Sequence, residues 1–180
     1  MTDTPDATAL SNTLKQHIRD VPDFPTEGIM FRDISTLLAD PEIFRITIEE
    51  MAKPFSNIDK VVIIESRGFI LGTPIAYAIG AGVVPVRKPG RLPFMTFAED
   101  YSLEYGTNSL EIHQDAITPG EKILIVDDLL ATGGTVGATI KLVQRLGGEI
   151  VGIAVLAELS ALNGRARIDA GIPVHSLVIY

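Results

Sequence analysis

The stretch KILIVDDLLATGGT, residues 122–135, contains the chain's clearest transition from strand to turn to helix. Within the strand predicted at residues 122–128, an apolar run lies between Lys122 and two adjacent acids, which is typical of a strand buried on both faces of a parallel sheet. A turn rich in threonine and glycine follows at residues 131–135. Apolar residues then recur at helical spacing over residues 136–146, before a glycine pair. A strand that leads directly into a helix is the unit of an α/β fold.

The same alternation extends over the rest of the chain. We predict strands at residues 60–65, 82–86, 149–159 and 173–180, and helices at residues 69–79 and 161–168. Near the start, leucine and isoleucine spacing predicts a helix within residues 7–20, and a second helix begins at Asp40 and Pro41, a residue pair typical of a helix start. The prediction is therefore one α/β domain over residues 1–180, with a central, mainly parallel sheet flanked by helices.

One stretch, residues 68–86, carries no charge and permits two interpretations. It has almost the length of a membrane span. However, Pro74, Gly80, Gly82 and Pro85 interrupt it, and a predicted strand precedes it directly. We therefore favour a buried helix followed by a buried strand.

Composition narrows the classes of partner and compartment. Hydrophobic residues make up 46% of the 180 residues and the formal net charge is −8, so a nucleic-acid backbone is not expected as the main partner. Cysteine is absent, which excludes disulfides and thiolate metal sites and agrees with a reducing compartment. The first ten residues lack the apolar core of a signal peptide. We expect a cytoplasmic protein that does not span a membrane.

The turn at residues 131–135 has the properties of a phosphate site. Free amides and the helix dipole attract an anion at a helix N-terminus, and glycines let the backbone approach it closely. The residues assigned to this site are Ala131, Thr132, Gly133, Gly134 and Thr135. The spacing matches neither a Walker A loop nor a Rossmann fingerprint.

Asp127 and Asp128 stand just upstream of that turn. Carboxylates accept hydrogen bonds and therefore recognise hydroxyl groups. A ligand with a diol at one end and a phosphate at the other, such as ribose 5-phosphate, satisfies both features. The alternative is an acidic strand end beside an ordinary helix start, and the complete string of residues 126–135 makes this alternative the weaker one.

The string VDDLLATGGT resembles the phosphoribosyl-diphosphate motif of type I phosphoribosyltransferases, in the form that the adenine phosphoribosyltransferases carry. Further stretches resemble that family in the same order along the chain: PDFPTEGIMFRDIS, IESRGF, RKPGRLP and YSLEYG. The resemblance implies the type I phosphoribosyltransferase fold, and transfer of phosphoribosyl from phosphoribosyl diphosphate to adenine in purine salvage. It also implies a homodimer.

The resemblance also implies a site for the leaving diphosphate. Its members are Ser66, Arg67, Arg87, Lys88 and Arg91, with a cis peptide bond between Ser66 and Arg67. Mg²⁺ is expected mainly on the ligand's own oxygens and waters, as that ion prefers. The three histidines have no ligand spacing, so we predict no metal site made by the protein alone.

Two further segments are assigned by the resemblance. Residues 94–113 correspond to the flexible catalytic loop, expected to contain a small antiparallel pair of strands, in which Glu104 moves a proton at the base and Tyr105 covers the reacting centre. Residues 20–36 correspond to a hood over the purine. The base-binding residues are expected to be Met30, through its backbone, and Phe31, Arg32 and Leu130.

Two other functions remain open from the sequence. A sister enzyme for another base, such as xanthine or orotate, differs in backbone contacts that a sequence does not reveal. A regulator that binds phosphoribosyl diphosphate without chemistry is a different class of protein. The absence of a preceding DNA-binding segment, the negative charge and the presence of Glu104 and Tyr105 disfavour it.

Overall fold

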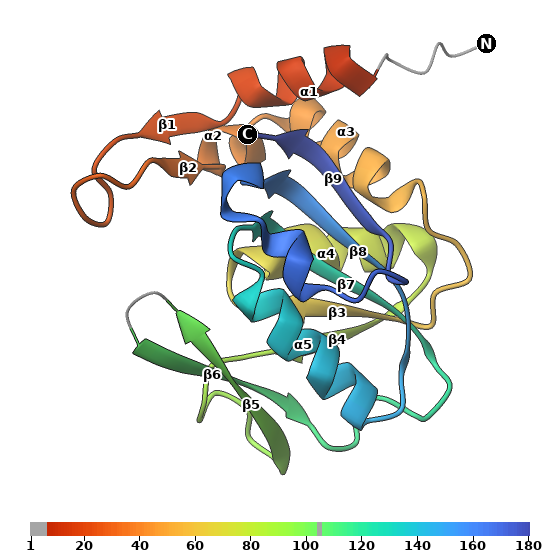
Figure 1. Ribbon diagram of the computed structural model, residues 1–180. Coiled ribbons are helices and arrows are strands. Elements are labelled where there is room, and N and C mark those ends of the chain that lie inside the picture. The colour runs from red at the N-terminus through yellow and green to blue at the C-terminus, as the bar shows by residue number, and fades with distance from the viewer. Residues whose placement is uncertain (1–6, 104–105) are drawn as a thin grey trace.

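A five-stranded sheet with the order β4-β3-β7-β8-β9 forms the centre of the computed structural model, which describes residues 7–103 and 106–180 (Figure 1). Its strands are β3 (Lys60–Ile64), β4 (Gly82–Val86), β7 (Lys122–Leu130), β8 (Glu149–Glu158) and β9 (Val174–Ile179). Every neighbouring pair is parallel, which confirms the predicted α/β architecture. β7 runs past the predicted end at residue 128, because it stays paired with β8 as far as Leu130.

Helices cover both faces of this sheet (Figure 1). They are α1 (Ala7–Gln16), α2 (Ser35–Ala39), α3 (Pro41–Ala52), α4 (Arg67–Ile79) and α5 (Gly134–Arg145). Side chains alternate along β7 accordingly: Leu124 and Val126 belong to the core shared with α1 to α4, whereas Ile123 and Ile125 belong to the core shared with α5. A strand buried on both faces needs apolar residues at successive positions, and this explains the unbroken run in the sequence.

The uncharged stretch forms most of α4 followed by β4, as predicted. Gly80 ends the helix in the left-handed conformation, with φ of 72°. Within residues 7–103 and 106–180, no helix has the length and apolar character needed to cross a membrane.

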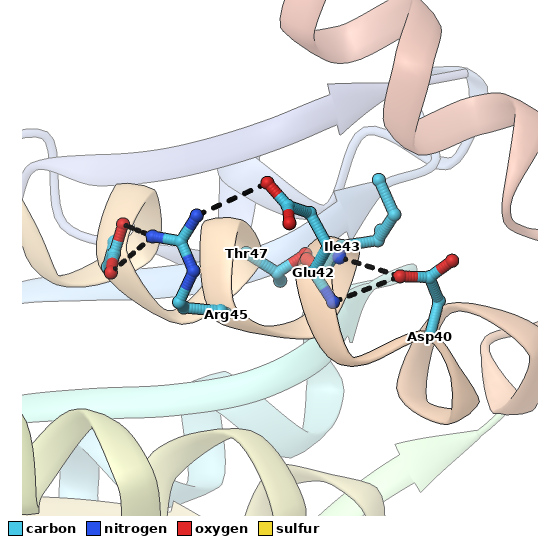
Figure 2. A network of polar contacts seen from close by, with 6 residues as sticks. Asp40, Glu42, Ile43, Arg45 and Thr47 are labelled. Atoms are coloured by element: carbon cyan, nitrogen blue, oxygen red, sulfur yellow. Dashed lines mark hydrogen bonds and ion pairs between the residues drawn. The ribbon is translucent and has the colours of Figure 1, made fainter. Parts of the chain in front are cut away.

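Helix α3 begins at the predicted cap. One carboxylate oxygen of Asp40 accepts hydrogen bonds from the backbone N–H groups of Glu42 and Ile43, both at 3.0 Å (Figure 2). Pro41 occupies the first helical position, where it sacrifices no hydrogen bond. Arg45 then pairs with Glu49 on the exposed side of the helix at 2.8 Å.

Two small antiparallel sheets lie outside the central one, one in the predicted hood and one in the predicted catalytic loop. The hood contains β1 (Arg19–Val21) and β2 (Phe31–Asp33), and the second sheet contains β5 (Thr96–Leu103) and β6 (Gly106–His113). The helix predicted at residues 161–168 is instead a pair of 3₁₀ turns, η1 (Ser160–Leu162) and η2 (Gly164–Arg167), because Asn163 interrupts it in the left-handed conformation.

Candidate active site

One cavity of about 310 Å³ lies beyond the carboxyl ends of β3 and β7, where parallel sheets usually bind their ligands. Its lining residues are Glu65, Ser66, Arg67, Lys88, Tyr101, Leu110, Asp127, Asp128, Leu129, Ala131 and Thr135. The fold thus brings part of each predicted group to one cavity: both diol acids, Ala131 and Thr135 of the phosphate turn, and Ser66, Arg67 and Lys88 of the diphosphate site.

The two acids of this cavity are only 7% exposed each. The Asp127 carboxylate accepts a hydrogen bond from the backbone N–H of Asp128 at 2.9 Å, and the Asp128 carboxylate pairs with Nε of Arg67 at 2.9 Å. Burial raises the pKa of Asp127, and the neighbouring Asp128 charge raises it further. Burial also raises the pKa of Asp128, although the Arg67 charge opposes this. Two neighbouring buried carboxylates favour a ligand that donates hydrogen bonds to them.

Helix α4 begins directly against these acids. A Cβ atom on Gly68 would lie 3.0 Å from the carbonyl oxygen of Val126 and 3.1 Å from the Asp127 carboxylate. Glycine therefore lets the first turn of α4 approach β7 closely enough for Arg67 to reach Asp128. The sequence did not single out Gly68, although a glycine directly after the predicted Ser66–Arg67 pair was a possible signal.

The predicted cis bond between Ser66 and Arg67 is wrong by one residue, because the structure has the cis bond between Glu65 and Ser66. Every residue other than proline strongly prefers the trans form before it. The sequence consequently carries no local signal for which peptide of this turn is cis.

Glu65 is a site residue that the sequence assignment missed. Its carboxylate accepts hydrogen bonds from Nε and Nη2 of Arg87, each at 3.1 Å, and from the backbone N–H of Lys88 at 3.0 Å. The Arg87 hydrogen bonds lower the pKa of Glu65. A carboxylate at the end of β3 therefore holds the segment that carries the predicted diphosphate cations.

The cations differ in what they already bind. Arg67 is paired with Asp128 and Arg87 with Glu65. Among the residues that the structure describes, neither Lys88 nor Arg91 forms a salt bridge. Lys88 lines the cavity, so its ammonium group is available to an anionic ligand.

The turn at residues 131–135 ends in α5, as predicted. Gly133 has φ of +79°, and a Cβ atom there would lie 2.4 Å from the carbonyl oxygen of Gly164. A Cβ atom on Gly164 would in turn lie 2.3 Å from the carbonyl oxygen of Ala131. Backbone thus packs on backbone, and η2 supports the turn from behind. Helix α5, which starts at Gly134, presents its first amides beyond this turn.

Phe31 is the residue of the predicted hood that lies beside Arg67 of the site. Its ring packs edge-on against Phe24 with centroids 5.0 Å apart, and the Arg67 guanidinium lies 5.0 Å from its centroid. Val21 and Asp33 join both rings around a recess of about 240 Å³.

The side chains of the other predicted base-binding residues have different surroundings. Met30 is 46% exposed, and Arg32 pairs with Asp20 and stacks on the Tyr180 ring. Leu130 is fully buried in the core beneath α5, whereas its neighbour Leu129 lines the cavity. Strand alternation accounts for this exchange, since adjacent residues point to opposite faces.

The predicted proton-transfer residues, Glu104 and Tyr105, lie outside the described residues. The strands on either side of them pair in register from Thr96 and His113 to Leu103 and Gly106. Tyr101 of this hairpin lines the cavity, and also lines a second cavity of about 510 Å³ along α5. The sequence did not single out Tyr101, which is one of several residues in the predicted catalytic loop at residues 94–113.

The base of this hairpin is attached to α5. The Lys141 ammonium pairs with Glu99 at 2.7 Å, and the Arg145 guanidinium lies 3.8 Å from the centre of the Phe97 ring. The helix that begins at the turn of residues 131–135 therefore also carries the segment leading to Glu104 and Tyr105.

The part of the chain that the structure describes contains no group of three or more His, Asp or Glu side chains suited to a metal ion. The cavity nevertheless offers two carboxylates, Asp127 and Asp128, to a ligand or to what the ligand carries. This donor set fits Mg²⁺ held mostly by phosphate oxygens and waters, because that ion rarely uses an all-protein cage.

Comparison with known proteins identifies the family. Residues 33–172 match the model of the phosphoribosyl transferase domain. The chain is 56% identical to adenine phosphoribosyltransferase of Roseobacter denitrificans, over 93% of this chain and 97% of the relative. It is also 56% identical to the enzyme of Thermotoga neapolitana, over 93% and 99%.

Solved structures agree with this match. Adenine phosphoribosyltransferase of Rhodothermus marinus superposes with a TM-score of 0.92 at 56% identity, over 97% of this chain and all of the other. The Saccharomyces cerevisiae enzyme, complexed with adenine and an imino-altritol bisphosphate, superposes with a TM-score of 0.87 at 38% identity, over 94% and 99%. The chain has the type I phosphoribosyltransferase fold, and it belongs to the phosphoribosyltransferase family, among the adenine phosphoribosyltransferases.

Proposed function

We propose that this protein transfers phosphoribosyl from 5-phospho-α-D-ribose 1-diphosphate to adenine, giving AMP and diphosphate in purine salvage. The observation that carries the proposal is a single cavity that joins two buried acids, a helix-opening turn and unpaired positive charge. Relatives at 51–56% identity with this activity in their names support the choice of adenine over other bases. The Giardia lamblia enzyme, 35% identical, was solved with 9-deazaadenine.

The cosubstrate lies along β7 and the turn that follows it. Asp127 and Asp128 accept hydrogen bonds from the ribose hydroxyls, and the amides and hydroxyls of residues 131–135 hold the 5-phosphate. The raised pKa values of both acids support this role, because hydroxyl donors compensate buried carboxylates. Holding the sugar at both ends fixes the anomeric carbon between them, which lowers the entropic part of the barrier.

The diphosphate leaves toward the turn after β3. Ser66 and Arg67 meet it there, and Lys88 and Arg91 bring positive charge that forms no salt bridge among the described residues. Arg87, held by Glu65, orients this segment. Mg²⁺, when bound with the cosubstrate, supplies further neutralisation of the leaving group. Preorganised positive charge of this kind stabilises a leaving group more in a partly dehydrated cavity than in water.

Adenine enters from the hood side, where Phe31 offers an apolar face near Arg67. Its N9 attacks the anomeric carbon from the side opposite the diphosphate and inverts that centre. Glu104 moves the proton on the base and Tyr105 covers the reacting centre, so water is kept from the activated sugar. The roles of Met30, Arg32 and Leu130 at the base remain predictions.

We further propose a cytoplasmic homodimer. The exposed apolar side chains Ile70 and Tyr77 on α4, 47% and 90% exposed, and Val83 on β4, 42% exposed, suit an interface between copies. The lack of cysteine suits a reducing compartment. Sedimentation analysis tests the dimer, and a monomeric mass at micromolar concentration contradicts it.

The function is tested by offering adenine, hypoxanthine, guanine, xanthine and orotate in parallel, with phosphoribosyl diphosphate and Mg²⁺. AMP from adenine alone is the expected result. Turnover of another base keeps the chemistry but refutes the assignment of adenine. Binding of phosphoribosyl diphosphate without turnover of any base indicates the regulator.

A further inference from the structure

Tyr180 follows the last strand of the central sheet and has a firmly held backbone. Its N–H donates to the carbonyl of Glu158 at 2.9 Å. Its carbonyl accepts from the backbone N–H of Ser160 at 3.0 Å and from the Ser160 hydroxyl at 2.6 Å. The residue is thereby fixed to the end of β8 and to η1.

The half-buried ring of Tyr180 meets a cation of the hood. The Arg32 guanidinium lies 3.8 Å from the ring centre. The Arg32 side chain is 19% exposed, and its Nε is buried with no hydrogen-bond partner among the described residues. Apart from the ion pair with Asp20, the Tyr180 ring is therefore the main partner of the Arg32 guanidinium. Cation–π contacts strengthen when the cation loses water.

This contact lies on the face of β2 opposite to the active site. Phe31 and Asp33 point to one face, where they surround the recess beside Arg67, and Arg32 points to the other. Within residues 7–103 and 106–180, β1 and β2 pair only with each other. An isolated two-stranded hairpin is marginally stable in water, so the hood depends on what holds it to the central sheet.

We propose that Tyr180 is a positioning residue for the base: its ring holds Arg32, and thereby β2, where Phe31 meets Arg67 at the mouth of the active site. The proposal extends the adenine-binding role of the hood and rests on the proposed function. It assigns to Tyr180 no contact with either substrate.

The kinetic test compares Tyr180→Ala with Tyr180→Phe, which keeps the ring and loses only the hydroxyl. We expect Tyr180→Ala to raise the KM for adenine about tenfold, the size of a partly buried cation–π contact of about 1.4 kcal/mol. The KM for phosphoribosyl diphosphate is expected to stay within about twofold, and Tyr180→Phe to match the parent. Lys15→Met is the control, since this lysine lies 5.1 Å from the same ring but on α1, outside the hood.

Equal increases in both KM values, or an unchanged KM for adenine in Tyr180→Ala, overturn the proposal. So does an equal effect of Lys15→Met. General destabilisation of the protein could also raise the KM values for both substrates. Hydrogen exchange is therefore used as a second measurement, because it reports which segments lose stability. We expect Tyr180→Ala to accelerate amide exchange in residues 19–33 while residues 122–130 keep their protection.

Hydrogen exchange does not depend on turnover. If the parent protein makes no AMP, the proposed function fails. Faster exchange confined to the hood in Tyr180→Ala still supports the proposal that Tyr180 holds the hood in place. Faster exchange in both residues 19–33 and residues 122–130, or in neither, refutes this role of Tyr180, whether or not the protein makes AMP.

Discussion

Replacing Gly133 by alanine tests the phosphate turn most directly. The residue has φ of +79°, and the added Cβ would lie 2.4 Å from the carbonyl oxygen of Gly164. Gly164 has little room to withdraw, because a Cβ atom built on it would itself lie 2.3 Å from the carbonyl oxygen of Ala131. The change therefore strains the turn and pushes it away from η2.

The magnitude has two parts. An L-residue in the left-handed region costs about 1–2 kcal/mol. At about 2–4 °C per kcal/mol for a chain of this size, the melting temperature falls by about 2–8 °C. Ordinary carbon–oxygen contacts are about 3.3 Å or longer, so the backbone moves by about 1 Å as well. A displacement of about 1 Å in a positioning element costs about a hundredfold in rate.

Gly137→Ala is the matched control, one turn further along α5. Its Cβ would meet nothing nearer than the carbonyl oxygen of Arg167 at 3.8 Å, an ordinary contact. Inside a helix, alanine is favoured over glycine by about 0.5–1 kcal/mol, so the melting temperature rises by about 1–4 °C. Melting curves and initial rates of AMP formation at varied phosphoribosyl diphosphate compare the two. Parent-like kcat/KM for that cosubstrate in Gly133→Ala refutes the assignment of the turn to the phosphate.

Three further predictions follow from the same contacts. Asp128→Ala leaves Arg67 without its partner and removes an acceptor for the ribose hydroxyls. We therefore expect the KM for phosphoribosyl diphosphate to rise and kcat to fall, so that kcat/KM decreases about a hundredfold. Unchanged kinetics contradict the diol assignment. Arg165 holds the pKa of Glu158 below its ordinary value, so the pair stabilises the fold above about pH 4.5 and the stabilisation is lost as the pH falls through the lowered pKa. Glu158→Gln therefore lowers the free energy of unfolding by about 1.5–3 kcal/mol at pH 7, and by progressively less as the pH falls below about 4.5, measured by urea titration. A loss that does not change with pH rejects the charge argument. Chelation of Mg²⁺ stops AMP formation and readdition restores it, whereas activity that persists in excess chelator contradicts the metal requirement.

The sequence predicted the central sheet well because its strands are buried on both faces. Such strands consist of unbroken apolar runs, and the acids at residues 127 and 128 mark the end of one of them. The same pattern cannot show where pairing stops. β7 continues to Leu130, since β8 extends equally far, and this places Leu130 in the core and Leu129 at the cavity.

The site was predictable where neighbours in sequence act together, as in the turn at residues 131–135. It was less predictable where the contacts join distant segments. The sequence shows Glu65 as an acid at a strand end, but its hydrogen bonds with Arg87 form only because β3 and β4 lie side by side in the fold. The cis bond before Ser66 and the stacking of Arg32 on Tyr180 likewise depend on tertiary packing, which local preferences do not encode.

The ion pair between Arg67 and Asp128 has a consequence for which molecules the free protein retains. A bare anion that draws Arg67 away leaves the buried Asp128 carboxylate without its cationic partner, and a bare diol leaves the guanidinium competing for the same oxygens. Only a molecule carrying both groups at the right separation satisfies every partner at once. We therefore expect free diphosphate and unphosphorylated ribose each to bind poorly, so that the pair screens cellular metabolites by requiring two chemical features together.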